Sequence, residues 1–382
     1  MFSGDPLSVP FNRPYASNGA LAALSNALAS GQHSGDGAWT RRVQEALSSE
    51  LLEADVLLTP SGTDALELAC MALGLRAGDE VVVPSFTFSS VATAPLRQGA
   101  SLRFADVEPD TLGLSVRTLE PVISDRTKAV IAVHYAGQAQ GLGELRAFCD
   151  EREIALIEDA AHSLGASLDG RPLGTFGSLA SLSFHETKNL SCGEGGALII
   201  NDPALLVPAE IIREKGTDRS QFFRGLVDKY TWVSPGSSFL LSDLLAAVLS
   251  AGLDDWEFTQ GNRRRAWERY DAELEDFRNL HGFSGPPSLP GNQIPWHMHY
   301  MLAPTEEARD SLLAHSKAND VLAVFHYQSL SQTPQGRRLN PDSAATPVSD
   351  DTARRLLRLP LFSAITDAEV DRVLEVVRAW SP

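Results

Sequence analysis

The stretch DVLLTPSGTDALELACMALGL, residues 55–75, contains a strand, a tight turn and a helix in immediate succession. The apolar run DVLLTP is typical of a buried strand, and the segment after residue 63 is typical of a helix. Ser61, Gly62 and Thr63 fall at the helix N-terminus, where free backbone N–H groups and the helix dipole suit an anion such as phosphate. An ordinary helix cap explains Ser61 and Thr63 equally well, so both interpretations stay open at this point.

The same alternation of strand-like and helix-like runs continues to about residue 202. The strand-like runs are rich in Val, Ile and Leu without a polar residue at every second position, as expected for strands covered on both faces. This pattern predicts an α/β fold with a mainly parallel sheet, whose ligands bind beyond the carboxyl ends of the strands. The runs are residues 55–60, 79–88, 101–107, 128–137, 154–161, 178–184 and 196–202.

The pattern changes in the last third of the chain. We expect one long helix from about Ser242 to Tyr270, and a Pro- and Gly-rich stretch follows at residues 282–295. After it the sequence predicts a smaller α+β unit, with strands near HMHYML and VLAVFHY.

These changes predict two domains. The expected large α/β domain covers residues 1–255, and the expected small C-terminal α+β domain covers residues 256–382. We expect the N-terminal arm, residues 1–40, to pack on the large domain.

The composition argues against a nucleic-acid-binding surface. The chain has 382 residues, 43% of them hydrophobic, with a net charge of −17 and a pI near 4.9. A nucleic-acid surface needs a basic stripe, and the sequence has none. The densest cationic run, Arg263-Arg264-Arg265, is expected to be a solvated helix face.

The sequence predicts no membrane span and no metal site. Its most apolar helical stretch, residues 239–253, is too short and, with Asp243, too polar to cross a bilayer. No signal peptide is visible at the N-terminus. Cys70, Cys149 and Cys192 lack metal-ligand spacing, so we expect a reduced, cytoplasmic protein.

Two segments place ionisable side chains where buried strands end. IALIEDAAH puts Glu158 and Asp159 after an apolar run, where a carboxylate needs a cationic partner or hydrogen bonds. A protonated pyridine nitrogen is one such partner, and a role as a loop cap is the alternative. SFHETKN puts Lys188 beside a glycine-rich loop in a chain with only five lysines against 27 arginines. Unlike Arg, a lysine can lose its proton and act as an amine nucleophile, although most lysines are solvated surface groups.

Together these features match the needs of pyridoxal phosphate (PLP). This cofactor is held by its phosphate, keeps its ring nitrogen protonated and is joined to an amine as a Schiff base. The turn at residues 61–63, Asp159 and Lys188 are suited to these three tasks. Phe88 is placed to stack on the ring and His162 to hydrogen-bond its phenolic oxygen, with a core aromatic and a loop histidine as the alternatives.

The motifs PSGTDAL, VPSFTF, HYAG, IEDAAH, SFHETKN and GEGG, in this order and spacing, resemble the DegT/DnrJ/EryC1/StrS sugar aminotransferases. The resemblance extends from about Phe11 to the C-terminus and implies a fold-type I PLP-dependent transferase. It implies that Lys188 is the Schiff-base lysine and proton shuttle and that Asp159 pairs with the pyridinium nitrogen. The other implied cofactor contacts are Gly62, Thr63 and Ser183 at the phosphate, Phe88 over the ring and His162 near its hydroxyl.

Residues 210–232, with GSSFLLSDL and FHYQSL, most resemble one subgroup, the dTDP-4-amino-4,6-dideoxy-hexose transaminases, and among them the galactose-forming type. The resemblance implies that the amino group of L-glutamate moves to C4 of dTDP-4-keto-6-deoxy-D-glucose. The galacto product is favoured over gluco, and amination at C3 of a related sugar is the alternative. The candidate substrate-binding residues are Arg224, Lys229, His326 and Tyr327.

The resemblance also implies a homodimer with shared active sites. Much of the family has Asn-Tyr-Lys where this chain has Ser238-Phe239-Leu240. The family Asn reaches the phosphate that is bound in the neighbouring subunit. The Ser238 side chain is shorter than that of Asn. Whether it makes this contact is therefore an open question, and a bridging water is the alternative.

Two other classes of protein compete with this interpretation. A nucleotide-dependent oxidoreductase or epimerase needs G-x-G-x-x-G after the first strand, and the nearest match, GLGELR at residues 141–146, lacks the third glycine. A PLP-binding regulator without catalysis is the second, and retention of Lys188 and Asp159 argues against it. Some family members replace the lysine by histidine and dehydrate their substrates, so Lys188 favours transamination.

Overall fold

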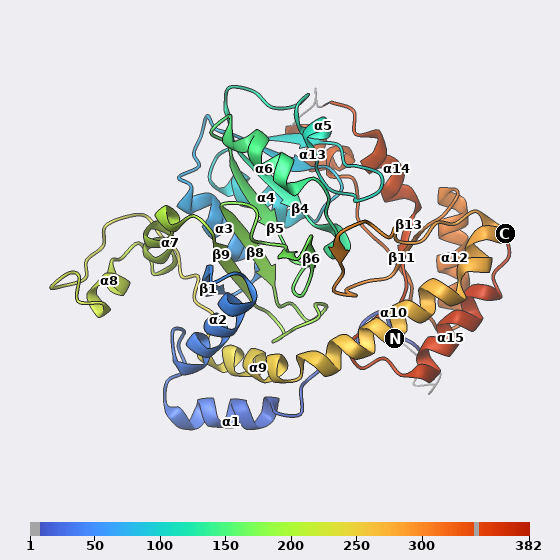
Figure 1. Cartoon of the computed structure of the whole chain (residues 1–382), viewed down its shortest axis with the longest axis horizontal. Coiled ribbons are helices and arrows are strands. Elements are labelled where there is room, and N and C mark those ends of the chain that lie inside the picture. The colour runs from blue at the N-terminus through green and yellow to red at the C-terminus, as the bar shows by residue number, and fades with distance from the viewer. Residues whose placement is uncertain (1–7, 340–343) are drawn as a thin grey trace.

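The computed structural model describes residues 8–339 and 344–382, and a seven-stranded sheet lies at its centre (Figure 1). The strand order is β1-β9-β8-β5-β4-β2-β3. Within this sheet β9 runs antiparallel to both neighbours, and the other neighbouring strands pair in parallel. The predicted mainly parallel α/β sheet is therefore confirmed. Its strands are β1 (Asp55–Thr59), β2 (Glu80–Pro84), β3 (Ser101–Ala105), β4 (Thr127–Val133), β5 (Ala155–Asp159), β8 (Leu179–Ser183) and β9 (Gly196–Ile200).

Helices cover both faces of this sheet, which explains why its strands are apolar throughout. In β2, for example, Val81 and Val83 join the core beneath α3 and α4, whereas Val82 joins the core beneath α6. The helices of this part are α1 (Ala20–Ser30), α2 (Ala38–Glu50), α3 (Gly62–Ala72), α4 (Ser89–Arg97), α5 (Val116–Leu119), α6 (Leu142–Asp150), α7 (Leu206–Arg213), α8 (Arg219–Phe223) and α9 (Asp243–Asp254).

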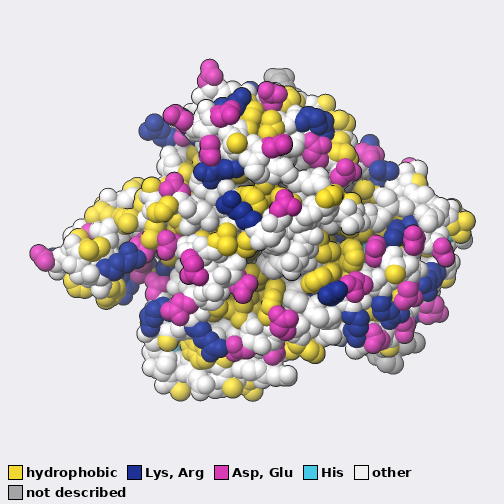
Figure 2. All heavy atoms as spheres, in the orientation of Figure 1, with side chains coloured by type: hydrophobic (Ala, Val, Ile, Leu, Met, Phe, Trp, Pro, Cys, Tyr) yellow, Lys and Arg dark blue, Asp and Glu magenta, His cyan; other side chains and the backbone are white. Residues whose placement is uncertain are grey.

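Residues 215–238, which we call the projecting segment, extend away from the body of the molecule. Helix α8 lies near its tip, far from the central sheet (Figure 1). Hydrophobic side chains lie open on this part of the surface beside charged ones (Figure 2). Over the rest of the face in Figure 2, acidic and basic side chains are interspersed.

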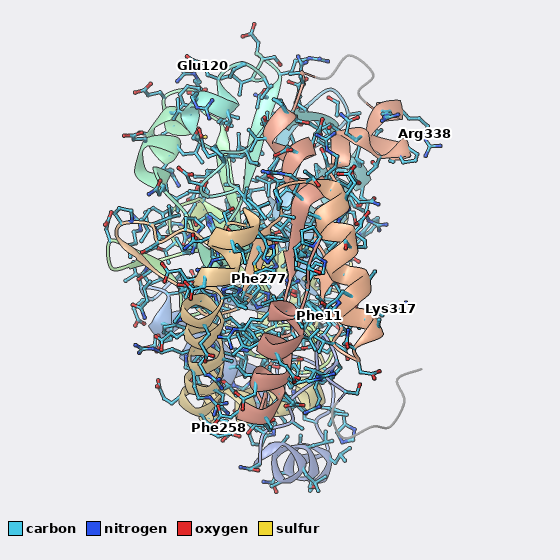
Figure 3. All side chains as sticks on the ribbon, turned by 90° about the vertical axis from the view of Figure 1, so that its right-hand side faces the viewer. Phe11, Glu120, Phe258, Phe277, Lys317 and Arg338 are labelled. Carbon is cyan, nitrogen blue, oxygen red and sulfur yellow. The ribbon has the colours of Figure 1, made fainter. Side chains whose placement is uncertain are left out.

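The last third of the chain has its own core around a three-stranded sheet with the order β11-β13-β12. Helices α10, α15 and α12 lie side by side along this unit, and Phe277 of α11 belongs to its core (Figure 3). The division of the chain at residue 255 stays a prediction. The elements are α10 (Trp256–Glu273), α11 (Glu275–His281), β11 (Tyr300–Leu302), α12 (Glu306–Ala318), β12 (Val324–Phe325), α13 (Pro334–Leu339), α14 (Pro347–Arg355), β13 (Leu356–Arg358) and α15 (Asp367–Arg378). A separate small sheet joins β10 (Asn292–Gln293), β6 (Ser167–Leu168) and β7 (Arg171–Pro172).

Two expectations for the helix after residue 242 are wrong. Instead of one helix there are two, α9 and α10, which meet at Asp255. The Asp255 carboxylate accepts hydrogen bonds from the Tyr15 hydroxyl at 2.9 Å and the Asn18 N–H at 3.1 Å, which ties the junction to the N-terminal arm. Arg263 is not solvated, because it is 1% exposed and donates to the His297 carbonyl at 3.1 Å and the Ser363 hydroxyl at 3.1 Å.

The N-terminal arm differs in part from the expectation. Its helix α1, together with helix α2 that begins at the end of the arm, packs against α9 on the large-sheet side. Residues 8–13 instead follow the C-terminal unit, where Val9 pairs with Val321 as a parallel β-bridge and Arg13 forms a salt bridge with Glu369 at 2.6 Å. Residues 1–7 lie outside the described part.

Among the described residues, no helix combines the length and apolar character that crossing a membrane requires. Their His, Cys, Asp and Glu side chains form no group of three or more that could hold a metal ion.

Candidate active site

A cavity of about 530 Å³ lies where the carboxyl ends of the large-sheet strands face the C-terminal unit. Side chains that follow β1, β2, β5 and β8 meet there, as expected for a parallel sheet. The cavity brings together most of the residues that the sequence singled out. They are Gly62, Thr63, Phe88, Asp159, His162, Ser183, Lys188, His326 and Tyr327.

One end of the cavity is an anion cradle at the N-terminus of α3. The Ser61 hydroxyl caps the helix by accepting from the Asp64 N–H at 3.0 Å, so Ser61 is an ordinary cap as well as a lining residue. The Thr63 and Ser90 hydroxyls are 2.6 Å apart, which brings the first turns of α3 and α4 together. A Cβ on Gly62 would lie 3.0 Å from the Ser183 Cβ, so glycine permits the close approach of the helix to β8.

Two neighbouring carboxylates at the end of β5 have different roles. Glu158 is fully buried and accepts hydrogen bonds from the N–H groups of residues 174, 176 and 177, and from His134 Nε2 at 2.7 Å. Although burial acts against its charge, these partners hold the pKa of Glu158 below its usual value. Glu158 is therefore a structural carboxylate.

Asp159 faces the cavity instead. Its Oδ1 accepts from the Ala161 N–H at 3.1 Å and lies 3.4 Å from the Ser181 hydroxyl. No described residue donates a hydrogen bond to its Oδ2. Burial raises the pKa of Asp159, although Lys188 and these hydrogen bonds counteract the effect. A cationic ring nitrogen at Oδ2 would favour the charged carboxylate.

Lys188 lines the same cavity, on the loop that follows β8. Burial of its ammonium group lowers the pKa of Lys188 to about 8, against the attraction of Asp159, and the nearby charge of Arg358 acts in the same direction as burial. A pKa near 8 leaves a substantial fraction of neutral amine near neutral pH, which is the form that attacks carbonyl carbons and accepts protons.

Neutral histidines surround the lysine. His162 and His297 stack with ring centroids 4.6 Å apart, and burial lowers the pKa of each well below its usual value. His297 Nδ1 donates to Asn189 Oδ1 at 2.7 Å, while the Asn189 amide donates to the Pro295 carbonyl. The Tyr327 hydroxyl lies 3.4 Å from His162 Nε2, at the limit of a hydrogen bond. These contacts fix the position of His162, which the sequence predicted to lie near the phenolic oxygen of PLP.

Phe88 and His326 close other parts of the cavity. Phe88 is 56% exposed, so the alternative of a core aromatic is wrong, and its ring lies 6.0 Å from that of Tyr327. His326 Nδ1 lies 2.9 Å from the buried Tyr135 hydroxyl, which orients the imidazole. Each side chain is held in a position that a planar ligand could use.

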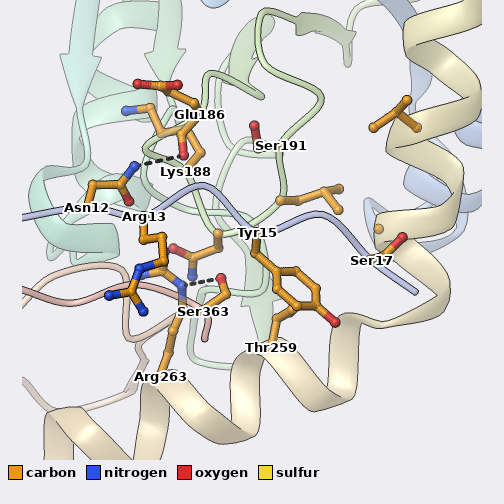
Figure 4. A pocket seen from close by; sticks show the side chains of 14 residues that line it. Asn12, Arg13, Tyr15, Ser17, Glu186, Lys188, Ser191, Thr259, Arg263 and Ser363 are labelled. Atoms are coloured by element: carbon orange, nitrogen blue, oxygen red, sulfur yellow. Dashed lines mark hydrogen bonds between the residues drawn. The ribbon is translucent and has the colours of Figure 1, made fainter. Parts of the chain in front are cut away.

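Behind the loop of Lys188 lies a second, much smaller cavity of about 20 Å³, shown in Figure 4. It has room for about one water. Asn12 of the N-terminal arm donates to the Glu186 carbonyl at 3.2 Å, and Arg263 donates to Ser363 across the same space (Figure 4). The arm and α10 therefore support the lysine loop from the side opposite the main cavity.

Three predicted residues do not line the cavity within one chain. Arg224 and Lys229 lie exposed on the projecting segment, where Arg224 pairs with Glu210. Ser238 is exposed and forms an isolated β-bridge with Glu214.

Several cavity residues were missed by the sequence analysis, among them Thr87, Ser90, His297 and Arg358. Thr87 and Ser90 flank Phe88, so their neighbourhood in the sequence was a usable signal. His297 and Arg358 come from the C-terminal unit. Neither residue belongs to a motif that carries the family resemblance, whereas His326 and Tyr327 belong to FHYQSL.

The residues present fit PLP. The cradle suits its phosphate, the open oxygen of Asp159 suits its ring nitrogen, and Lys188 would supply the amine. When bound, PLP supplies an electron sink beside the reacting carbon. Lys188 would then hold or move the proton, and Asp159 would keep the ring nitrogen charged. This fold and this site define a PLP-dependent aminotransferase.

Known proteins of the same fold lead to the same class. The model of the DegT/DnrJ/EryC1/StrS aminotransferase family matches residues 15–378, and the chain belongs to this family. The predicted family, PLP cofactor and transaminase activity are thereby confirmed. The two competing interpretations, an oxidoreductase or epimerase and an inactive PLP-binding regulator, are wrong.

Three solved structures illustrate the similarity. The aminotransferase TlmJ from Streptoalloteichus hindustanus has a TM-score of 0.89 at 28% identity over 97% of this chain and 98% of that one. A DegT DnrJ EryC1 StrS aminotransferase from Brucella abortus has a TM-score of 0.84 at 30% identity over 94% and 95%. DesV from S. venezuelae has a TM-score of 0.87 at 28% identity over 98% of each chain.

The pKa of Lys188 predicts how the cofactor-free protein captures PLP at different pH values. Because only the neutral amine attacks the aldehyde, the capture rate should rise about tenfold per pH unit below the pKa and level off above it. The bend is expected near pH 8, which is the pKa of this amine. Stopped-flow absorbance measures the rate, with a free lysine derivative as the control for the titration of PLP itself. A rate that keeps rising beyond pH 10, as for an ordinary lysine, would contradict the lowered pKa.

Proposed function

We propose that the enzyme moves the amino group of L-glutamate to C4 of dTDP-4-keto-6-deoxy-D-glucose and forms the galacto amino-sugar. The observation that carries this proposal is the resemblance of residues 210–232 to the C4-acting subgroup. The site supports the reaction class. A transaminase uses one site for the amino donor and the keto-sugar in turn, and this chain offers the Lys188 amine in a single cavity for both.

The stereochemistry of the product depends on the pose of the sugar. Lys188 reaches the cavity from one side, so it delivers its proton to the sugar carbon from that side. An axial or equatorial amine then follows from how the hexose ring lies in the cavity. Contacts that set such a pose are worth about 1–3 kcal/mol each, so a few substitutions near Arg224, Lys229 or His326 can reverse it.

Incubation with the 4-keto sugar and L-glutamate, followed by NMR of the product, tests the assignment. We expect an amine at C4 and a small proton coupling between C3 and C4, as in the galacto configuration. A large coupling means gluco and overturns the stereochemical part. An amine at C3, or no reaction with the 4-keto sugar, overturns the substrate assignment.

We also propose that the enzyme is a homodimer with shared active sites. The projecting segment exposes a group of large apolar side chains, and such a surface marks a contact with another protein. Arg224 and Lys229 lie on the same segment, outside the cavity of their own chain, so a second copy of the chain is the partner that gives them a site. The exposed apolar residues are Phe222, Phe223, Leu226, Tyr230, Trp232 and Val233.

The dimer predicts that Trp232→Glu weakens self-association. Trp232 is 76% exposed on the projecting segment, and burying a carboxylate in its place is costly. Analytical ultracentrifugation should show the dissociation constant raised by about 100-fold or more. Leu280→Glu is the matched control, because Leu280 is 79% exposed on α11. A wild-type protein that is an active monomer at assay concentration would refute the dimer.

The proposed compartment is the cytoplasm. Cys70, Cys149 and Cys192 are free and buried. Burial raises the pKa of Cys70 and Cys192 to about 12 and that of Cys149 to about 11, so these thiols stay protonated and unreactive. Free thiols of this kind fit a reducing compartment.

A further inference from the structure

The phosphate cradle at the N-terminus of α3 needs more donors than the sequence analysis assigned within one chain. Gly62 and Thr63 of α3 and Ser183 of β8 line it. A phosphate monoester presents three acceptor oxygens and up to two negative charges, so several donors are required to hold it firmly. The family resemblance implied one further donor from a partner subunit, at the position where this chain has Ser238.

Ser238 is poorly suited to supply that donor. The Lys215 N–H donates to the Ser237 carbonyl at 2.9 Å. The Phe239 N–H donates to the Arg213 carbonyl at 3.1 Å, and the Phe239 ring is buried. The backbone on both sides of Ser238 is therefore held near the end of α7. Because the main chain cannot move forward, the serine hydroxyl ends one bond short of where an Asn amide would end.

Ser90 lies at the cradle instead. It belongs to the first turn of α4, which begins without a side-chain cap from Phe88. The Ser90 hydroxyl lies 2.6 Å from the Thr63 hydroxyl, and both residues line the main cavity. The N-termini of α3 and α4 therefore meet at this point, and the positive ends of both helix dipoles favour an anion there.

The two hydroxyls keep a proton for a ligand. Thr63 and Ser90 each carry one hydroxyl proton, and among the described residues neither hydroxyl has a partner besides the other. The hydrogen bond between them uses one proton, whichever residue donates it. The second proton is free to bond an anion, and a phosphate group can accept both.

The turn between β2 and α4 contains another hydroxyl that lacks a partner. Thr87 is 1% exposed and lines the same cavity, and no described residue forms a hydrogen bond with its Oγ1. Burial of a hydroxyl without a hydrogen bond is unfavourable. The turn from Thr87 to Ser90 therefore has the composition of a surface that meets a polar ligand.

The contact with Thr63 identifies the anion. Gly62 brings the start of α3 so close to β8 that a Cβ on it would lie 3.0 Å from the Ser183 Cβ. Ser90 adjoins this same small space, where the phosphate of PLP belongs, and hydroxyls 2.6 Å apart can bond one phosphate group. The diphosphate of a sugar nucleotide would find the space already filled by the cofactor.

We propose that Ser90, at the N-terminus of α4, completes the phosphate site from within the same chain, so that Ser238 of the partner subunit is not needed to hold PLP. This inference concerns the cofactor alone. It is independent of the identities of the sugar and the amino donor, so a wrong substrate assignment would leave it untouched.

Equilibrium dialysis of the cofactor-free protein tests the phosphate contact. Ser90→Ala should raise the dissociation constant of PLP about 10- to 100-fold, the usual effect of one hydrogen bond to a charged group. Pyridoxal has the same ring and aldehyde but no phosphate, so its dissociation constant should change less than about threefold. Ser90→Thr keeps the hydroxyl and should bind PLP nearly as well as the wild type does.

Two further variants complete the comparison. Ser89→Ala is the matched control, because Ser89 is exposed on the same turn of α4 and does not line the cavity. Ser238→Ala should leave the dissociation constant of PLP unchanged. Phosphorus NMR of the loaded proteins observes the phosphate directly, and its resonance should move in Ser90→Ala but not in the other two alanine variants.

Each other outcome overturns the inference. An unchanged dissociation constant of PLP in Ser90→Ala excludes a bond to the phosphate. An equal loss for PLP and pyridoxal, or no recovery in Ser90→Thr, assigns Ser90 to the packing of α4 against α3. A loss in Ser238→Ala as large as that in Ser90→Ala restores the contact from the partner subunit. A raised KM for the sugar nucleotide beside an unchanged PLP constant would place the diphosphate of the substrate at Ser90.

Discussion

Lys188→Ala is expected to lower the transamination rate at least about 10³-fold, because it removes both the nucleophile and the proton carrier. The visible absorbance of the covalently held cofactor should disappear with it. The fold should persist, since the substitution removes a buried amine whose charge is already disfavoured by desolvation. Absorption spectra, turnover of L-glutamate and thermal unfolding measure the three effects.

Lys317→Ala is the control for this variant, because Lys317 is exposed at the end of α12. It should keep the spectrum and the rate of the wild type. Normal transamination by Lys188→Ala would show that another amine performs the chemistry.

Asp159→Asn should take up PLP yet lose activity by roughly 100- to 1000-fold. The amide is nearly the same size as the carboxylate, but it cannot hold a proton on the ring nitrogen, and an unprotonated ring is a poor electron sink. Cofactor titration and steady-state rates separate retained binding from lost turnover. An unchanged rate would remove Asp159 from the site.

The matched control is Glu158→Gln, on the preceding residue of the same strand. Gln cannot accept all the hydrogen bonds that Glu158 receives from His134 and three backbone N–H groups. Chemical denaturation should therefore show a loss of roughly 3 kcal/mol in the free energy of unfolding. In the folded variant, activity should fall far less than in Asp159→Asn. The reverse pattern would exchange the roles assigned to the two carboxylates.

The sequence predicted the parts of the site that lie close to strand ends. Gly62, Asp159 and Lys188 each follow an apolar run, and a parallel sheet brings such positions to one edge. The order and spacing of the motifs then specified the cofactor. The difference between Glu158 and Asp159 could not be predicted, because it depends on which face of β5 each side chain occupies and on which loops supply N–H groups.

Two contributions of the C-terminal unit, His297 and Arg358, were beyond a pattern-based prediction. Arg358 lies in RRLLRLP, where nothing distinguishes it from its arginine neighbours until the sheet turns it toward the cavity. The helix from Ser242 to Tyr270 was predicted to be continuous. Its break at Asp255 could not be predicted from local sequence, because it is stabilised by Tyr15 and Asn18, which are distant in sequence. Burial of Arg263 likewise depends on carbonyls from remote loops.

The path of residues 8–13 has a consequence for the biogenesis of the enzyme. These residues leave the ribosome long before Val321 and Glu369, which hold Val9 and Arg13. Contacts of such long sequence separation form late in folding. Phe11 supports Arg358 and Asn12 supports the lysine loop, so both walls of the catalytic chamber await the synthesis of the C-terminal unit. We therefore expect a nascent chain that still lacks the C-terminal unit to be unable to retain the vitamin-derived cofactor.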